Sequence, residues 1–150
     1  MENLKLKNQL CFPLWLCAKE ITQAYEPMLS ALDLTYTQYV AMMFFWENDG
    51  ASCSDLSDAL YLKSSTTTPV IERLVQKGYL SKRQAKDDAR RQIINVTPKG
   101  NELKYQAVRI PEKIGSCVDL KPEEAATLYR LLYKVIDNIE KEKYEHRNRD

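Results

Sequence analysis

Apolar residues in the first part of the chain recur at helical spacing. Steps of three and four residues lead from Leu10 to Leu32, which predicts an amphipathic helix over about 10–32. Pro13 has no N–H to donate, so this helix either begins at about residue 10 to 12 or is distorted there. Pro27 predicts a kink near its far end.

Three more helices are predicted before residue 80. Thr35-x-x-Gln38 is a capping sequence ahead of apolar residues that continue to Asn48-Asp49-Gly50. Ser52-x-x-Asp55 opens a short helix that ends near the turn at 61–64. The segment 65–77 has a polar Ser/Thr-rich start, an apolar underside and Gly78 as a stop signal.

The rest of the chain predicts a hairpin followed by two helices. The runs 79–84 and 91–96 contain β-forming residues on either side of a charged loop. Thr97-Pro98 starts a helix over about 98–117, and Lys121-Pro122 starts the last one. That last helix carries a narrow, heptad-like apolar seam, which is typical of a helix that packs against another helix. The fold class is therefore mainly α with a small β-hairpin.

Length and composition indicate an ordinary globular chain. With 150 residues, 44% of them hydrophobic, we expect one main unit. The longest apolar stretches, such as 39–46, stop well short of the roughly 20 residues that a membrane span needs. The N-terminus lacks the features of a secretory signal, so we expect a cytoplasmic protein with no membrane partner and reduced cysteines.

The cysteines and the histidine do not form a metal motif. The four cysteines are too far apart for a C-x-x-C pair or a zinc knuckle, and His146 lies in a charged tail. We therefore predict no metal and no cofactor.

The formal net charge of +1 conceals a segregation of charge along the chain. Residues 1–62 have 3 Lys and Arg against 8 Asp and Glu, whereas residues 63–109 have 11 against 4. Residues 110–150 are nearly balanced, with 8 against 9. A strongly basic central block is typical of a module that meets phosphate, although basic segments are also often just solvated.

The order of the central elements is that of a winged helix-turn-helix module. Hydroxyls at the start of the helix over 65–77 suit base-edge contacts, because they can donate or accept hydrogen bonds. Arg90 and Arg91 lie in the hairpin, from which an arginine can enter a narrow minor groove.

Several motifs in this segment resemble the multiple-antibiotic-resistance-regulator (MarR) family of dimeric repressors. They are Leu60-Tyr61-Leu62, Ser65-x-x-Thr68-Pro69, Arg73-Leu74, Gly78-Tyr79-Leu80, Asp88-x-Arg90-Arg91 and Thr97-x-Lys99-Gly100. The resemblance implies a homodimer on a pseudo-palindromic operator in double-stranded DNA. It implies dimerisation helices over about 10–34 and 98–146, and a DNA-binding lobe over about 36–97 that forms one unit with them. The residues we expect to contact DNA are Ser64, Ser65, Thr66, Thr67, Thr68, Arg73, Lys86, Asp88, Arg90 and Arg91.

Cys11 stands at the predicted start of the first helix, where unpaired N–H groups and the positive helix end stabilise a thiolate. Its surroundings resemble the organic hydroperoxide resistance regulators within the MarR family, on Asn8-Gln9-Leu10-Cys11-Phe12, Tyr25-x-Pro27 and Leu34-Thr35-Tyr36-x-Gln38-Tyr39. This resemblance implies that Cys11 reacts with peroxide and that Tyr25 and Tyr36 hydrogen-bond it. Pro13 departs from the family pattern.

The spacing of these residues restricts how they can meet. If Cys11 and Tyr25 share one helix, fourteen residues separate them by about 21 Å. The tyrosine must then come from the other protomer.

The resemblance also implies a resolving cysteine. Cys117 matches its position in two-cysteine members, where a disulfide crosses between subunits; alternatively, a small thiol caps the oxidised Cys11. Cys17 is badly placed for this role, because six residues of helix turn it away from Cys11. We expect Cys17 and Cys53 to be small core residues.

Together these features predict a repressor that releases its operator when organic hydroperoxide or a related oxidant oxidises Cys11. It is not an enzyme, because the thiol is consumed without turnover. Two alternatives stay open: a repressor released by a small phenolic or lipophilic ligand, and a thiol peroxidase that uses Cys11 and Cys117.

Overall fold

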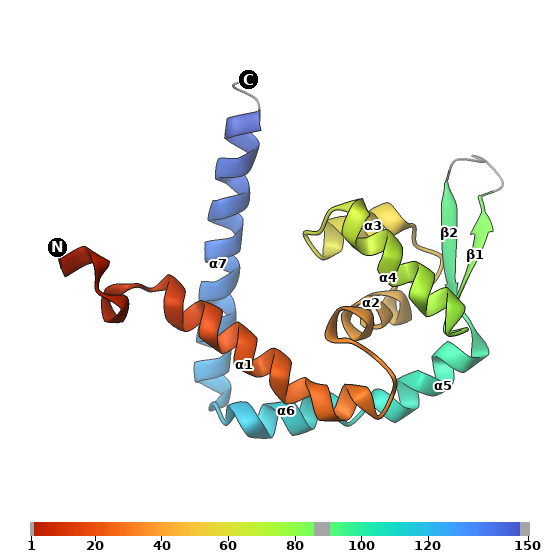
Figure 1. Ribbon diagram of the computed structural model, residues 1–150, viewed down its shortest axis with the longest axis horizontal. Helices are drawn as coiled ribbons and strands as arrows, with labels where there is room; N and C mark the ends of the chain where they lie inside the picture. The colour runs from red at the N-terminus through yellow and green to blue at the C-terminus, as the bar shows by residue number, and fades with distance from the viewer. Residues whose placement is uncertain (1, 86–90, 148–150) are drawn as a thin grey trace. The chain divides into compact units, whose positions relative to one another are not determined.

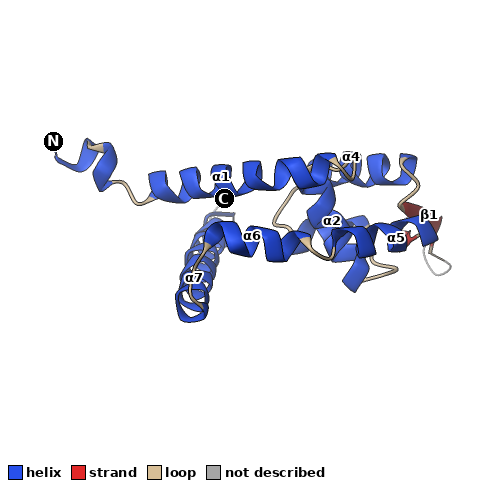
Figure 2. Cartoon of the chain, turned by 90° about the horizontal axis from the view of Figure 1, so that it is seen from below, coloured by secondary structure: helices blue, strands red, loops and turns tan. Residues whose placement is uncertain are grey.

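The computed structural model describes residues 2–85 and 91–147. This part of the chain is mainly helical, with one antiparallel hairpin (Figures 1 and 2), which confirms the predicted fold class. The elements are two 3-10 helices, η1 (Glu2–Leu4) and η2 (Leu6–Asn8), followed by α1 (Cys11–Ser30), α2 (Tyr36–Glu47), α3 (Cys53–Ala59), α4 (Ser64–Gln76), β1 (Leu80–Gln84), β2 (Gln92–Val96), α5 (Pro98–Ala107), α6 (Ile110–Val118) and α7 (Pro122–Arg147).

The chain packs as two compact units, Met1–Ile114 and Gly115–Asp150, whereas the sequence predicts one main unit. The larger unit holds the buried core. In the smaller unit no side chain between Pro122 and Glu145 is buried. The seam residues Leu128 and Ile139 of α7 are 41% and 48% exposed. This stretch of helix therefore has no apolar core of its own in the single chain.

The helix starts predicted from capping sequences are confirmed. Thr35 and Gln38 form a reciprocal capping box at α2, and Ser52 and Asp55 form one at α3. At α5 the Thr97 hydroxyl accepts from the Gly100 N–H at 3.0 Å. Each box satisfies backbone donors that the first turn of a helix leaves without partners.

Helix α1 begins at Cys11, which places Pro13 at the third helical position. The first four N–H groups of a helix have no intrahelical acceptor, so proline costs no hydrogen bond there. The alternative of a distorted helix around Pro13 is thus unnecessary. Pro27 lies in the last turn of α1, which continues to Ser30.

The single helix predicted over 98–117 is wrong, because the chain forms α5 and α6 with a break at Val108 and Arg109. Pro111 explains the break. Its ring clashes with the carbonyl of the residue four positions earlier, Ala107, and it has no N–H for that carbonyl. A new helix can start at Ile110 because proline is tolerated in a first turn.

The core of the larger unit is built around α2 (Figure 1). The α2 side chains Met42 and Phe45 are fully buried, together with Leu56 of α3, Leu74 of α4 and Ile94 of β2. The hairpin pairs Leu80 with Val96 at its base and Gln84 with Gln92 towards its tip. A single apolar cluster therefore joins α2, α3, α4 and the hairpin.

The base of the hairpin approaches α5 too closely for any side chain at Gly100. A Cβ on this residue would lie 2.2 Å from the Tyr79 carbonyl oxygen and 2.9 Å from Val96 Cγ1. The Gly100 carbonyl in turn accepts a hydrogen bond from Trp46 Nε1 of α2 at 3.0 Å. Gly100 thus allows β1, β2, α2 and α5 to meet at one point.

We expect Gly100→Ala to lower the free energy of unfolding by about 2–3 kcal/mol, because the added methyl group displaces backbone rather than a flexible side chain. Urea unfolding followed by circular dichroism at one fixed protein concentration measures this. Gly115→Ala is the matched control: nothing lies within 4 Å of its Cβ, and it should gain about 0.5–1 kcal/mol from helix propensity. A Gly100→Ala protein as stable as wild type would disprove the close approach.

Candidate functional site

The first turn of α4 presents a row of hydroxyl groups. Ser64, Ser65, Thr66 and Thr68 are exposed there, and Lys63 precedes the helix without a side-chain cap. These four hydroxyl-bearing side chains are thus available to a partner molecule. Their contact with DNA stays a prediction.

Thr67 does not fit the predicted role, because it points into the protein. It is 1% exposed, and its hydroxyl lies 2.6 Å from the hydroxyl of Ser57 on α3. Ser57 also donates to the Cys53 carbonyl at 2.9 Å, so this buried polar pair is fully engaged. The prediction that Thr67 contacts DNA is wrong. Its spacing of four and seven residues from Ile71 and Leu74 places it on the buried face, a signal already present in the sequence.

Cys53 supports the same junction from α3. Its sulfur lies 3.6 Å from the Thr67 hydroxyl and 3.5 Å from that of Thr68. The residue is half-buried, as expected for a packing cysteine. Together with Ser57, it ties α3 to the first turn of α4.

Basic residues continue along α4 and into the hairpin. Arg73 is exposed on α4, and Lys82 of β1 forms an ion pair with Glu72 of α4. The predicted wing residues Lys86, Asp88 and Arg90 lie outside the described residues.

Arg91 is described and exposed at the start of the returning strand. The pKa of Asp55 is held below its usual value, first by hydrogen bonds from the backbone and side chain of Ser52 and in smaller part by the positive charge of Arg91. Arg91 therefore lies within electrostatic reach of the start of α3.

Sequence reasoning missed the residue that anchors the hairpin to the α2–α3 loop. Asp49 accepts from the Val96 N–H at 2.8 Å and from the Asn95 side-chain amide at 3.3 Å. The Asn95 side-chain oxygen in turn accepts from Arg83 at 3.1 Å. Asp49 was visible in the sequence only as part of a helix stop, so nothing there indicated this long-range contact.

Cys11 is the first residue of α1 and is exposed. The sequence predicted this position at or near the helix start. The backbone N–H groups of this first turn have no intrahelical partners, so the thiol lies beside the positive end of the helix dipole.

The predicted phenols, Tyr25 and Tyr36, lie against each other. Their ring centroids are 5.0 Å apart in an edge-on arrangement, and Tyr39 lies 5.9 Å from Tyr25. Burial raises the pKa of Tyr25, and neighbouring Tyr36 raises it further. Burial also raises the pKa of Tyr39, and its neighbours Tyr25 and Tyr36 raise it further. The hydroxyls of Tyr25 and Tyr39 therefore stay protonated near neutral pH and can donate hydrogen bonds.

The single chain brings the two phenols together but not the thiol. Cys11 and Tyr25 are fourteen residues apart on the one helix α1, which corresponds to about 21 Å. A hydrogen bond between them within one chain is therefore impossible.

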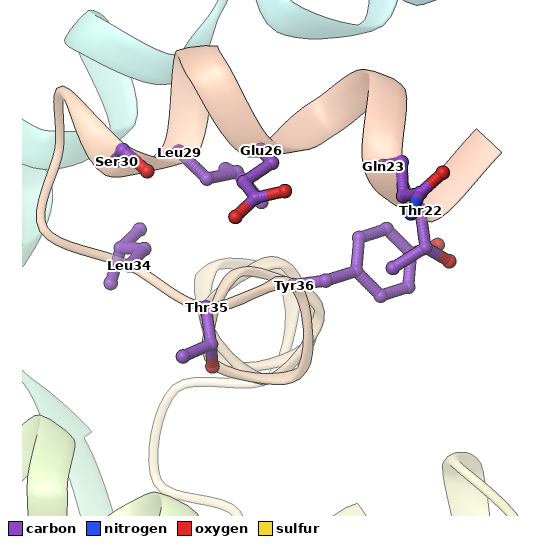
Figure 3. A pocket seen from close by; sticks show the side chains of 8 residues that line it. All are labelled: Thr22, Gln23, Glu26, Leu29, Ser30, Leu34, Thr35 and Tyr36. Carbon is purple, nitrogen blue, oxygen red and sulfur yellow. The ribbon is translucent and has the colours of Figure 1, made fainter. Parts of the chain in front are cut away.

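A cavity of about 300 Å³ lies at the junction of α1 and α2, and Tyr36 is one of its lining residues. Figure 3 shows the Tyr36 ring extending from the start of α2 beneath Thr22 and Gln23, with the Glu26 carboxylate pointing from α1 into the space. Leu29 and Leu34 supply apolar walls. The cavity combines apolar surface, hydroxyl groups and one carboxylate.

The remaining cysteines differ in exposure. Cys117 is exposed in α6, and Cys17 is exposed on α1. The expectation that Cys17 is a core residue is wrong for the single chain, because its side chain is exposed there.

Within residues 2–85 and 91–147, no helix is long and apolar enough to span a membrane. The same described residues contain no group of three or more His, Cys, Asp or Glu arranged to hold a metal ion.

Comparisons with known proteins place the chain among regulators. The family model described as transcriptional regulator SarA/Rot matches residues 23–107. The organic hydroperoxide resistance transcriptional regulator of Bacillus subtilis is 34% identical over 92% of this chain and 94% of its own length.

Solved structures show the same fold. AbfR is a protein of Staphylococcus epidermidis. The structure of reduced AbfR bound to DNA aligns with this chain with a TM-score of 0.74 and 30% identity. The alignment covers 92% of this chain and 96% of that one. Overoxidized AbfR bound to DNA also has a TM-score of 0.74 and 30% identity, over 92% of this chain and 97% of that one. The chain therefore belongs to the MarR family of winged helix-turn-helix transcriptional regulators, with relatives of the organic hydroperoxide resistance and SarA/Rot types.

Proposed function

We propose that this regulator is a homodimeric repressor that binds a pseudo-palindromic operator when reduced and releases it when organic hydroperoxide oxidises Cys11. One observation carries the proposal. An exposed thiol begins the same helix that holds, about 21 Å away, one of a pair of adjacent phenols. Two copies of such a helix, arranged antiparallel, bring each thiol to the other copy's phenols.

The relatives support both the partner and the effector. A protein 30% identical to this one was solved on DNA in reduced and overoxidized forms. A relative with 34% identity is a regulator of organic hydroperoxide resistance. Double-stranded DNA and an organic hydroperoxide are therefore the partner and the effector class that we assign.

The DNA-binding lobe is the segment 36–97. The exposed hydroxyls of Ser64, Ser65, Thr66 and Thr68 on α4 suit base edges and phosphates in the major groove. Arg73 and the arginines of the hairpin supply positive charge for the phosphates. The excess of 11 basic over 4 acidic residues in 63–109 supports this assignment.

Exposed apolar residues support a dimer built from 10–34 and 98–146. Leu10, which precedes α1, and Trp15 of α1 are 72% and 60% exposed. On α7, six apolar residues between Leu128 and Ile139 are each at least 37% exposed. Contiguous apolar surface of this kind marks an interaction site, and a second copy of the chain is the partner that a family dimer requires.

The reaction at Cys11 is a two-electron oxidation. The thiolate attacks one oxygen of the hydroperoxide, an S–O bond forms and the O–O bond breaks. The leaving alkoxide takes a proton and departs as the alcohol, and the sulfur is left as sulfenic acid. The hydroxyls of Tyr25 and Tyr36 of the other copy donate hydrogen bonds to the thiolate before the reaction.

The sulfenic acid then reacts with a thiol, which forms a disulfide and releases water. Exposed Cys117 of the other copy is the thiol we favour, and a small cellular thiol is the alternative. In either case the oxidised sulfur no longer accepts the hydrogen bonds of the two phenols. Their rearrangement alters the spacing of the two α4 helices, which must match half-sites about one helical turn apart.

A second candidate function is a repressor released by a small phenolic or lipophilic ligand. The cavity of about 300 Å³ at the α1–α2 junction favours it, because Leu29, Leu34 and Tyr36 provide apolar and aromatic walls. In that case Cys11 plays no part in release.

The substitution Cys11→Ser tests the proposal directly. We expect cumene hydroperoxide to weaken binding of the wild-type protein to its operator by about 5- to 150-fold, a usual range for coupled sites. The Cys11→Ser protein should bind equally well before and after treatment. Fluorescence anisotropy measures both, with a duplex that the reduced protein has selected from a randomised pool.

Cys17→Ser is the matched control, because Cys17 is an exposed cysteine on the same helix and should leave release unchanged. Release that persists in Cys11→Ser would exclude the thiol mechanism and favour the ligand-released repressor.

Cys117→Ser separates the two fates of the sulfenic acid. We expect oxidised wild-type protein to run as a covalent dimer on a non-reducing gel, and both Cys11→Ser and Cys117→Ser to run as monomers. A dimer band that survives in Cys117→Ser would disprove its resolving role. A monomer whose mass has increased by that of an added small thiol would identify the alternative.

Thr66→Val and Thr67→Val should affect different properties: the first operator binding, the second the stability of the fold. Thr66→Val removes an exposed hydroxyl and should weaken operator binding about fivefold, the loss of roughly 1 kcal/mol of hydrogen bonding. Thr67→Val removes the buried partner of Ser57 and should lower the free energy of unfolding by about 1–2 kcal/mol. Anisotropy and urea unfolding measure the two effects. A Thr67→Val protein of wild-type stability would contradict the buried pair.

A further inference from the structure

The ammonium group of Lys77, at the C-terminal end of α4, reaches the turn that joins α1 to α2. It donates to the Asp33 backbone carbonyl, lies 3.0 Å from the Asp33 carboxylate and donates to the Gln38 side-chain oxygen at 3.3 Å. An ammonium group has three N–H donors. Three acceptors at a single turn therefore match its full donor capacity.

The turn lies in the α1–α2 corner, the segment 30–38 that runs from the last residue of α1 to the first residues of α2. Asp33 adopts a left-handed conformation with φ of +52°. The Asp33 N–H donates to the Ser30 carbonyl at 3.0 Å, and the Leu34 N–H donates to the Leu29 carbonyl at 2.9 Å. The corner is thus a defined turn with its own hydrogen bonds, and the Asp33 carbonyl projects from it towards α4.

Because Gln38 is buried, the contact between Lys77 and the corner is not only an ion pair at the surface. Its side chain is 4% exposed, and its oxygen also accepts from the Thr35 N–H in the capping box of α2. The Asp33 carboxylate is 85% exposed, so its ion pair with Lys77 is screened and contributes little to stability. The buried amide and the backbone carbonyl instead fix the geometry of the contact.

The phenols are attached to the same corner. Tyr36 is the first residue of α2, immediately after the capping residue Thr35, and its ring lies edge-on against Tyr25 of α1. One of the two phenols, Tyr36, is therefore part of the corner that Lys77 contacts, and the other packs directly against it.

The two ends of α4 are held in different ways. At the N-terminal end, buried Thr67 is bonded to Ser57 of α3 inside the lobe. At the C-terminal end, Lys77 bonds to the corner, and its backbone carbonyl accepts from Lys99 of α5 at 2.7 Å. Among these polar contacts, that of the Lys77 ammonium connects α4 to the corner that carries Tyr36. The apolar cluster joins α4 to the body of α2 as well.

We propose that Lys77 is the positioning residue that couples the phenol pair to the DNA-reading helix. This inference rests on the proposed function, since it names how oxidation at Cys11 reaches α4. In the reduced protein the ammonium holds α4 against the corner. When the phenols rearrange around oxidised Cys11, the corner turns, the bonds to Asp33 and Gln38 break, and α4 loses its position.

Lys77→Met tests this coupling, because it keeps the aliphatic stem and removes the charge and the donors. Lys104→Met is the control for the loss of one positive charge, at an exposed lysine of α5. Operator affinity is measured before and after one equivalent of cumene hydroperoxide, and the ratio of the two affinities is compared. We expect wild type and Lys104→Met to show the full release of about 5- to 150-fold. Lys77→Met should show a several-fold smaller ratio.

Lys77→Arg retains the charge and offers donors in a planar fork. It should retain the larger part of the release. A Lys77→Met protein with the wild-type ratio would overturn the inference, whatever its affinity in the reduced state.

A second measurement needs no oxidant. Coupling is reciprocal, so a duplex bound to α4 must also stabilise the corner. Hydrogen exchange of the reduced protein should slow over residues 30–38 when the duplex is added, and this effect should vanish in Lys77→Met while slowing over α4 persists. Equal slowing of the corner in both proteins would overturn the inference. Loss of peroxide response in the wild-type protein would overturn the proposed function alone, because the exchange result still decides the role of Lys77.

Discussion

A continuous α-helix holds its two ends at a fixed distance, and this constraint governs where the proposed sensing chemistry can take place. Cys11 begins α1, and Tyr25 follows fourteen residues later on the same helix, about 21 Å away. No change of side-chain rotamer closes that gap. A contact between thiol and phenol therefore requires a second copy of the chain. Under the proposed function, the chemical state of the sulfur is thereby a property of the dimer rather than of one chain.

Because one helix keeps Cys11 and Tyr25 apart, the packing of the phenols also bears on how the proposed sensor works. Tyr25 and Tyr36 come from different helices, and their contact is part of the packing of α1 against α2. Because burial raises the pKa of Tyr25, its phenol remains a donor near neutral pH and accepts no negative charge itself. Under the proposed function, the hydroxyls of Tyr25 and Tyr36 donate to the thiolate of the other copy and lose that acceptor once the sulfur is oxidised. The proposed reaction would thus change the forces at one of the places where α1 packs against α2.

The sequence predicted most of this local structure, because its signals act over a few residues. The capping boxes at Thr35 and Ser52 were visible as short patterns, and both form as expected. The errors came from competing effects. The break between α5 and α6 follows from Pro111, whose ring disrupts a segment that otherwise favours helix. Thr67 was assigned by its chemistry to the surface, although its spacing from Ile71 and Leu74 places it inside.

Contacts between distant segments could not be predicted in this way. Asp49 holds β2, Trp46 bonds to Gly100, and Lys77 grips the α1–α2 corner across 44 residues of sequence. Each of these depends on how whole elements pack, and no local pattern marks a lysine that ends one helix as the partner of a turn between two others. For the same reason, sequence reasoning named candidate sensing and DNA-reading residues but not the contact of Lys77 with the corner.

Under the proposed coupling, a small movement at the corner is enough for release, because the lobe is densely packed. One apolar cluster joins α2, α3, α4 and the hairpin, with Met42, Phe45 and Ile94 fully buried. Such a core resists deformation, so a local change is transmitted as a shift of the whole element rather than absorbed. In a dimer that spans two half-sites about 34–36 Å apart, even a modest shift of each α4 breaks the match with DNA at both ends. In the proposed coupling the hydrophobic core thus supplies the rigidity, and the different polar contacts at the two ends of α4 make its C-terminal end the one that moves.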